Sequence, residues 1–215
     1  MKIGILGTGD VGKALAKGFA GIGYEVMVGS RDANSEKAQA IVKEVGGNIS
    51  AGSFADAAKF GDMAVVCTLW AGTENALKLA GHENLAGKVI IDTTNPLDFS
   101  QGMPPRLGVG HTDSAGEQIQ RQLVDAKVVK AFNIVGNPDM VNPDFPGGPP
   151  DMFICGNDAD AKKKVTEILN AFGWNSVVDI GNIEGARLLE PLCILWVQYG
   201  VSTGGWRHAF KMLRK

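Results

Sequence analysis

Residues 2–12, KIGILGTGDVG, decide the fold of this chain. Residues 2–7 are an apolar run ending in glycine, which predicts a buried strand, and residues 11–22 have the apolar spacing of a helix. Between them, GTGDVG (7–12) has the form G-x-G-x-x-G. Gly7 permits a tight turn, Gly9 lets the backbone approach a pyrophosphate, and Gly12 lets strand and helix pack. In this strand–turn–helix context the motif predicts a dinucleotide site at the N-terminus of the helix.

The end of the second predicted strand, within VMVGSRD (26–32), indicates which dinucleotide binds. NAD-binding domains usually place an acid here to accept hydrogen bonds from the adenosine ribose, and that acid would repel a 2′-phosphate. This chain has Ser30 and Arg31 instead, and Lys37 follows in the next helix. A guanidinium suits phosphate geometry, so the pattern favours NADP, although Arg31 beside Asp32 and Lys37 could also be ordinary surface cations.

Strands and helices alternate along the 215 residues as in an α/β Rossmann-type fold, with a doubly wound, mostly parallel sheet. Strands are expected at 24–30, 48–50, 63–69, 88–96, 126–136, 152–156 and 176–181. Helices are expected at about 35–45, 53–59, 72–80, 115–123, 159–172 and 184–200, the helix after SAGE (114–117) with a capping box. We predict an NADP-binding domain over 1–182 and a C-terminal helical segment over 183–215 that completes the substrate site and a dimer contact.

Composition narrows the class of protein. The chain is 45% hydrophobic with a net charge of −2, which gives no reason to expect nucleic acid or a membrane as partner. Its 29 glycines exceed the usual share of about 7%. The three cysteines are widely separated in apolar stretches, which favours buried free thiols in the cytoplasm over disulfides or a metal site.

Other loops at the carboxyl ends of strands are candidates for the rest of the cofactor site. Cys67, Thr68 and Leu69 follow one strand, and Trp70 next to them either covers the cofactor or packs under a loop. Asn95 and Pro96 end DTTNP (92–96), where Asn95 is either a nicotinamide contact or a turn residue. Ala131 and Asn133 lie in KAFN (130–133), where a buried Asn133 needs either a ligand or a structural partner.

No catalytic residue is evident, and neither is a metal site. The chain has no Y-x-x-x-K pair, and its histidines, His82, His111 and His208, do not fall at central strand ends. Reduction of a carbonyl normally requires a nearby proton donor. An acceptor that takes hydride at a ring carbon and is protonated by solvent does not, and a flavin-like ring is such an acceptor.

The order of GILGTGDVG, VGSR, DTTNP, KAFN, FICGNDADAKKKV and DIGNIEGARLLEP resembles the coenzyme F420-dependent NADP oxidoreductase family over nearly the whole chain. The resemblance implies a homodimer and hydride transfer between NADPH and the deazaflavin ring of coenzyme F420. A flavin (FMN or FAD) is the alternative second substrate. It also implies the cofactor contacts. The 2′-phosphate is assigned to Thr8, Ser30, Arg31 and Lys37, and the pyrophosphate side to Gly9, Asp10 and Val11. The archaeal members carry histidine where this chain has Asn133.

Two other functions remain open. An NADP-dependent imine or hydroxyacid reductase shares the glycine fingerprint, but it would have a longer helical C-terminal domain than residues after 182 can form. A non-catalytic NADP-binding sensor is compatible with the missing proton donor. The apolar stretch EPLCILWVQYGV (190–201) is expected to be buried in a homodimer.

Overall fold

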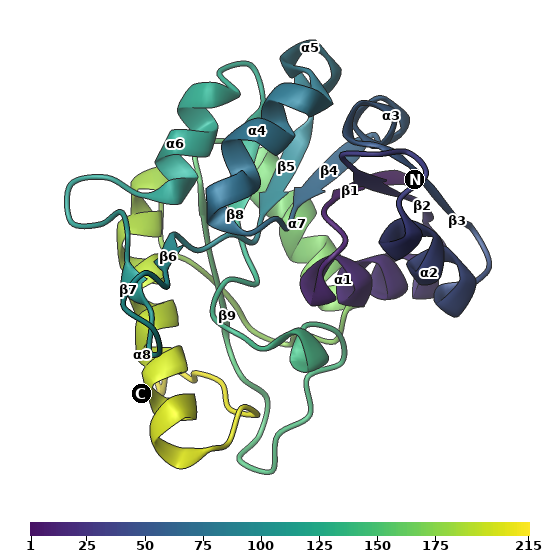
Figure 1. Cartoon of the computed structure of the whole chain (residues 1–215). Coiled ribbons are helices and arrows are strands. Elements are labelled where there is room, and N and C mark those ends of the chain that lie inside the picture. Colours follow the sequence, from purple (N-terminus) through teal and green to yellow (C-terminus); the bar gives the residue numbers. More distant parts are fainter.

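The computed structural model describes residues 1–215 and contains an eight-stranded sheet with helices on both faces (Figure 1). The strand order is β10-β9-β8-β5-β4-β1-β2-β3. The strands are β1 Lys2–Leu6, β2 Glu25–Ser30, β3 Ile49–Ser53, β4 Met63–Val66, β5 Val89–Asp92, β8 Lys127–Lys130, β9 Met152–Gly156 and β10 Val177–Asp179. The helices are α1 Asp10–Gly21, α2 Glu36–Val45, α3 Phe54–Phe60, α4 Trp70–Ala80, α5 His82–Leu85, α6 Ala115–Gln122, α7 Ala159–Ala171 and α8 Ala186–Thr203. The predicted Rossmann-type α/β fold is confirmed.

Alternation along the buried strands creates two apolar cores, one on each face of the sheet. In β1, Ile3 and Ile5 face the core covered by α1, α2 and α7, whereas Leu6 faces the core under α3, α4, α5 and α6. All three side chains are fully buried. This is the pattern of a parallel sheet whose strands are covered on both sides.

Along this sheet the strands from β3 to β8 are all parallel, and β9 pairs antiparallel with β8. Because β10 pairs parallel with β9, both β9 and β10 run opposite to the other strands. The β8–β9 register joins only Val129 to Gly156 and Lys130 to Cys155. The first residues of β9, from Met152, therefore extend beyond the carboxyl end of β8. Consequently β9 forms a side wall next to the edge where the predicted ligand site lies.

Several element boundaries differ from those predicted. The strands expected at 63–69 and 126–136 end early, at Val66 and Lys130, where the chain turns out of the sheet. The third strand is longer than the predicted 48–50 and runs from Ile49 to Ser53. The short helix α5, the two-residue strands β6 (Leu97–Asp98) and β7 (Arg106–Leu107), and the 3₁₀ turns η1 (Asn137–Asp139) and η2 (Ile183–Gly185) were not expected.

The predicted capping box of α6 forms only in part. The Ser114 hydroxyl accepts a hydrogen bond from the Glu117 backbone N–H at 3.2 Å, as a cap should. The Glu117 carboxylate, however, accepts from the Ser114 hydroxyl and from the Arg187 guanidinium, so it does not reach back to the backbone of Ser114. The Arg187 guanidinium thus takes the place of the Ser114 backbone N–H as a donor to Glu117.

Helix α8 runs along one side of the molecule, and the chain beyond it folds back as an irregular tail (Figure 1). In the tail, the Arg207 guanidinium pairs with the buried Asp139 carboxylate, and the Trp206 ring lies 5.7 Å from the Trp196 ring. No helix in the structure combines the length and the apolar character that crossing a membrane requires.

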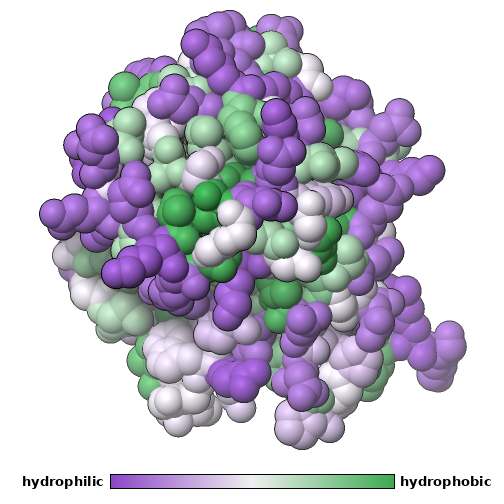
Figure 2. Space-filling view, turned by 90° about the vertical axis from the view of Figure 1, so that its right-hand side faces the viewer, coloured by the Kyte–Doolittle hydropathy of each residue, from purple (hydrophilic) through white to green (hydrophobic).

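Apolar side chains are distributed unevenly over the surface. The face that carries α2, α3 and β3 is rimmed by hydrophilic side chains, with apolar ones confined to patches among them (Figure 2). On the opposite side of the molecule, α8 exposes Leu188, Leu195 and Tyr199 by 69%, 56% and 53%. These residues recur at helical spacing, so they form one apolar stripe along α8.

Candidate functional site

The sequence-predicted site residues gather at one edge of the sheet. Strands β1, β2, β4, β5 and β8 are parallel, so their carboxyl ends share an edge. The chain passes from β1 outward to β2 and β3 and then returns to β4 on the other side of β1. This reversal between β1 and β4 is the position where open α/β sheets bind ligands.

The three glycines of the turn after β1 differ in backbone conformation and in the space around them. Gly7 has a φ of +141°, which an L side chain rarely adopts. A Cβ on Gly12 would lie 2.3 Å from the Gly7 carbonyl oxygen, so only glycine lets α1 pack so closely on the turn. A Cβ on Gly9 would meet nothing within 4 Å. The backbone is therefore open to a ligand at Gly9 and closed by packing at Gly12.

Helix α1 presents an uncapped N-terminus at this turn. Gly9 is its N-cap, and no side chain caps the helix. The first backbone bond into the helix runs from the Lys13 N–H to the Gly9 carbonyl at 2.9 Å. The N–H groups of the first turn and the positive end of the helix dipole can therefore bind an anion. Thr8 and Val11 are half-buried beside the turn, and Asp10 is exposed.

The end of β2 is joined directly to this turn. The Gly7 N–H donates to the Gly29 carbonyl at 3.1 Å, which places Ser30 and Arg31 next to the glycine turn. Ser30 is buried, and its hydroxyl donates to the backbone carbonyl of Asp32. It can donate to a bound phosphate only by rotating away from that carbonyl.

The two predicted phosphate-binding cations are free of acidic partners. Arg31 and Lys37 are both exposed, and neither takes part in an ion pair. The Asp32 carboxylate, which could have neutralised Arg31, accepts instead from the Asn34 backbone N–H at 2.9 Å. Both positive charges thus remain available to an anion at the end of β2.

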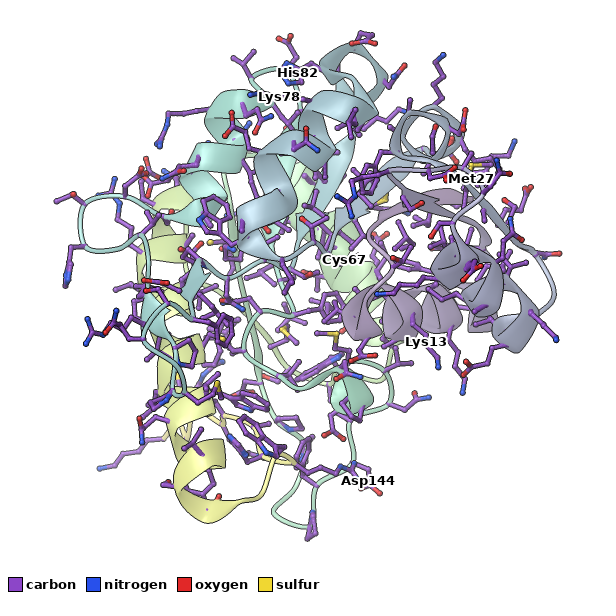
Figure 3. All side chains as sticks on the ribbon, in the orientation of Figure 1. Lys13, Met27, Cys67, Lys78, His82 and Asp144 are labelled. Carbon is purple, nitrogen blue, oxygen red and sulfur yellow. The ribbon has the colours of Figure 1, made fainter.

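Cys67 lies between the glycine turn and β4, in the middle of the sheet edge (Figure 3). A Cβ on Gly7 would lie 2.7 Å from the Cys67 carbonyl oxygen and 3.0 Å from its sulfur. The thiol donates to the Leu6 carbonyl, and burial raises the pKa of Cys67 to about 12. The side chain is therefore a packed spacer under the turn. Burial likewise raises the pKa values of Cys155 and Cys193 to about 12.

The residues after Cys67 start helix α4. The Thr68 hydroxyl lies 2.8 Å from the Thr73 hydroxyl, and Leu69 is 82% exposed at the N-cap of α4. Trp70 is half-buried and packs against the core beneath α4, in agreement with the packing alternative. Of these three predicted positions, Leu69 is the side chain most open to a ligand.

The loops after β5 and β8 are joined by a pair of asparagines. The Asn95 side-chain amide donates to the Asn133 backbone carbonyl at 2.8 Å, and the Asn133 amide donates to Asn95 Oδ1 at 2.9 Å and to the Leu189 carbonyl at 2.9 Å. Asn133 lies three residues beyond the end of β8, not within the strand as predicted. Its Oδ1 is buried without a partner. Pro96 and Ala131 are buried beside this pair.

Three buried charges beneath this loop were missed by the sequence-based prediction. The Lys130 ammonium lies 2.8 Å from Asp92 Oδ2 and 3.0 Å from Glu190 Oε1, and the side chains of all three are at most 1% exposed. Burial opposes the charge of Lys130, but the two carboxylates outweigh it and raise the pKa of the ammonium. A lysine inside the apolar run VVKAF was the available signal.

None of the three histidines hydrogen-bonds to Asn95 or Asn133. His82 lies on α5 near Lys78, at the far end of α4 from its N-terminus (Figure 3). The His208 ring stacks on Trp196 at 4.6 Å, and its two nitrogens lie near the carbonyls of Trp196 and Gly205. His111 lines a hollow of about 640 Å³ beside the N-terminal half of α8.

Comparisons with known proteins agree with this geometry. The family model described as "NADP oxidoreductase coenzyme F420-dependent" matches residues 2–96. The F420-dependent NADP reductase of Methanocaldococcus jannaschii is 34% identical over 92% of this chain and 91% of its own length. A solved structure assigned to an F420-dependent NADP reductase from Arthrobacter sp. FB24 superposes with a TM-score of 0.94 at 41% identity, covering 100% of both chains. An imine reductase from Streptomyces aurantiacus, with a TM-score of 0.67 at 16% identity over 94% of this chain and 64% of its own, shares the fold alone.

Proposed function

Because the chain belongs to the coenzyme F420-dependent NADP oxidoreductase family, we propose that it transfers hydride between NADP(H) and coenzyme F420 or a related flavin. The chain is an NADP-dependent oxidoreductase, and the identity of the second substrate is the proposed part. One observation carries the proposal. The glycine turn after β1, with open space at Gly9, is hydrogen-bonded to the end of β2, and Arg31 and Lys37 beyond that end have no acidic partner.

The dinucleotide would lie across the carboxyl edge with its adenosine end at β2. Arg31 and Lys37 would bind the 2′-phosphate, with hydroxyls from Ser30 and Thr8 as further donors. The backbone at Gly9, Asp10 and Val11 would bind the pyrophosphate, with Gly7 making the turn and Gly12 packing α1 against it. Two features support this arrangement, namely the open space at Gly9 and the uncapped N-terminus of α1.

The nicotinamide end would lie over the loops that follow β4, β5 and β8. The lining residues would be Thr68, Leu69, Asn95, Pro96, Ala131 and Asn133, with Cys67 supporting them from below. Asn133 Oδ1 is a buried acceptor that lacks a donor, and the carboxamide of nicotinamide is a donor of the required kind.

The cofactor supplies the hydride chemistry, and the protein supplies orientation and exclusion of water. The polar groups at the proposed nicotinamide end are amides and hydroxyls, and no histidine hydrogen-bonds to Asn95 or Asn133. This chemistry suits a deazaflavin or flavin ring, which takes hydride at a ring position and exchanges its proton with solvent. It is poorly suited to a carbonyl substrate, which requires an acid next to the oxygen.

The C-terminal segment, 183–215, would close the site and supply a dimer contact. Helix α8 reaches the proposed nicotinamide end, where its Leu189 carbonyl accepts a hydrogen bond from the Asn133 side-chain amide. Its outer stripe of Leu188, Leu195 and Tyr199 is exposed, and a second copy of the chain would cover it in a homodimer.

The test is oxidation of NADPH, followed at the nicotinamide absorbance band, with F420, FMN and riboflavin offered separately. Rapid turnover with F420 is expected, and turnover with a flavin alone would move the proposal to that acceptor. A cyclic imine is the control for the imine reductase alternative. Tight NADPH binding without oxidation by any acceptor would overturn the proposal in favour of a sensor.

A further inference from the structure

We propose that Lys130 is a positioning residue, which, with Asp92 and Glu190, fixes the loop 93–96 and thereby the nicotinamide ring relative to the second substrate. The inference rests on the proposed function, because it concerns the nicotinamide end of that same site. It adds that the buried charges set the geometry of hydride transfer, whereas the residues at β1 and β2 set the affinity for the phosphates.

The loop after β5 is held at every polar atom of Thr94. The Thr94 backbone N–H and hydroxyl both donate to Asp92 Oδ1, at 2.8 Å and 2.7 Å. The Thr94 carbonyl accepts from the Lys130 ammonium at 2.7 Å. Thr94 is followed directly by Asn95, whose amide is paired with Asn133. The lysine and the aspartate together therefore determine the direction in which Asn95 leaves the strand.

The same lysine connects this loop to the helices on the other side of the site. Glu190, in α8, pairs with Lys130 and also accepts from the backbone N–H groups of Ala115 and Gly116, at 2.9 Å and 3.0 Å. Those groups are the N-terminus of α6, whose dipole offsets the second negative charge of the cluster. One ammonium thus joins β5, β8, α6 and α8 at the edge where hydride transfer would occur.

Stability alone gives little reason to bury these charges. Removing ions from water costs about as much as their mutual attraction returns, so a well-packed apolar cluster would stabilise the fold equally well. Charged hydrogen bonds differ in being directional, because each allows one arrangement of donor and acceptor. Asp92 Oδ2 illustrates this dependence, since the ammonium of Lys130 is its single close partner.

The experiment compares Lys130→Met with Lys88→Met. Lys88 is a matched control because it stands at the amino end of β5, where its ammonium donates to the carbonyls of Ala58 and Gly61 at 2.7 Å and 2.6 Å. Both variants lose an ammonium that binds backbone oxygen, but only Lys130 contacts the loop 93–96. Binding is measured for NADP⁺ and for 2′-phospho-ADP-ribose, which lacks the nicotinamide ring. Hydride transfer from NADPH to F420 is measured in a single turnover.

In Lys130→Met we expect unchanged affinity for 2′-phospho-ADP-ribose, about tenfold weaker NADP⁺ binding, and about 100-fold slower hydride transfer, the size of effect that a displacement of about 1 Å produces. Lys88→Met should lose stability, while the ratio of its affinities for NADP⁺ and 2′-phospho-ADP-ribose and its rate of hydride transfer stay at the wild-type values. Equal losses of both ligands in Lys130→Met, or an unchanged rate, would overturn the inference.

A gentler variant decides the question if Lys130→Met does not fold. Thr94→Val keeps the shape of a side chain that is 3% exposed and removes only the hydroxyl bond to Asp92. It should slow hydride transfer and spare 2′-phospho-ADP-ribose binding, and an unchanged transfer rate would contradict the inference. A wild-type chain that binds NADP⁺ but transfers no hydride would instead overturn the proposed function, so the two failures are distinguishable.

Discussion

Asn95 and Asn133 hydrogen-bond each other in both directions across 38 positions of sequence. One amide donates to a backbone carbonyl and the other to a side-chain carbonyl, so neither residue can move without its partner. A third bond, from Asn133 to the Leu189 carbonyl, extends the pair to α8. Two loops and a helix therefore form one rigid polar wall at the carboxyl edge of the sheet.

Arg31→Asp should abolish the preference for NADP over NAD. The substitution would remove the proposed charged hydrogen bond to the 2′-phosphate and add repulsion, so NADP⁺ affinity should fall about 30-fold or more while NAD⁺ affinity is kept or improved. Titration calorimetry with both dinucleotides measures the ratio. Lys43→Asp is the matched control, because Lys43 is an exposed cation on α2 without an ion-pair partner. An unchanged NADP⁺-to-NAD⁺ ratio in Arg31→Asp would remove the basis for the phosphate site.

Gly9→Ala and Gly12→Ala should separate binding from folding. The methyl group on Gly9 has open space, although alanine is less favourable than glycine at an N-cap, so the free energy of unfolding should fall by less than about 1 kcal/mol. NADP⁺ affinity should nevertheless fall, because the methyl would occupy the proposed place of the pyrophosphate. The methyl on Gly12 meets the Gly7 carbonyl and should cost about 1–3 kcal/mol of stability. Urea unfolding and calorimetry give the two quantities, and full NADP⁺ affinity in Gly9→Ala would contradict the placement.

The Glu117–Arg187 pair should stabilise the fold only above acidic pH. The Arg187 hydrogen bonds hold the pKa of the Glu117 carboxyl below its ordinary value of 4.5, although burial opposes this. A lowered folded-state pKa gives stability that is present above the unfolded pKa and is lost as pH falls through the folded one. Glu117→Gln should therefore be less stable than wild type at pH 6–7, and the gap should narrow as pH falls below about 4. Urea unfolding across this range measures the gap, and a gap independent of pH would refute the assignment.

Leu195→Glu should dissociate the proposed homodimer. Leu195 is 56% exposed in the apolar stripe of α8, and a carboxylate there would be buried unpaired in an interface between two copies. Sedimentation at micromolar concentration should give a dimer for wild type and a monomer for the variant. Leu79→Glu, on α4 and 47% exposed in wild type, is the control that should leave the mass unchanged. A monomeric wild type would remove the idea.

Much of the fold could be predicted because its signals are local. The glycine turn at 7–12, the apolar run of β1 and the acid-free end of β2 are each contained within a few consecutive residues. Strand ends were harder, because the apolar run of β4 continues into Cys67 while its neighbour β1 already ends at Leu6. Pairing ends where the neighbouring strand ends, and the sequence of one strand does not contain that information.

The buried cluster could not be assembled from sequence for a related reason. Lys130 stands out as a charge in an apolar run, but its partners are 38 positions before it and 60 after it. Identifying them requires the pairing of β5 with β8 and the position of α8 against α6. For Glu117 the local rule predicted a bond to the Ser114 backbone N–H, whereas the carboxylate accepts from the Ser114 hydroxyl and from Arg187, 70 positions away.

The three native cysteines should react little with thiol-directed labels. Each thiol is buried and has a pKa raised to about 12, so its reactive thiolate is scarce at neutral pH. A single new cysteine on the surface would then react alone with a maleimide dye. Fluorescent reporters can be attached to the tail or to the loop before β9 without first removing any natural sulfhydryl, and movements of those segments during turnover can be followed in the otherwise unaltered protein.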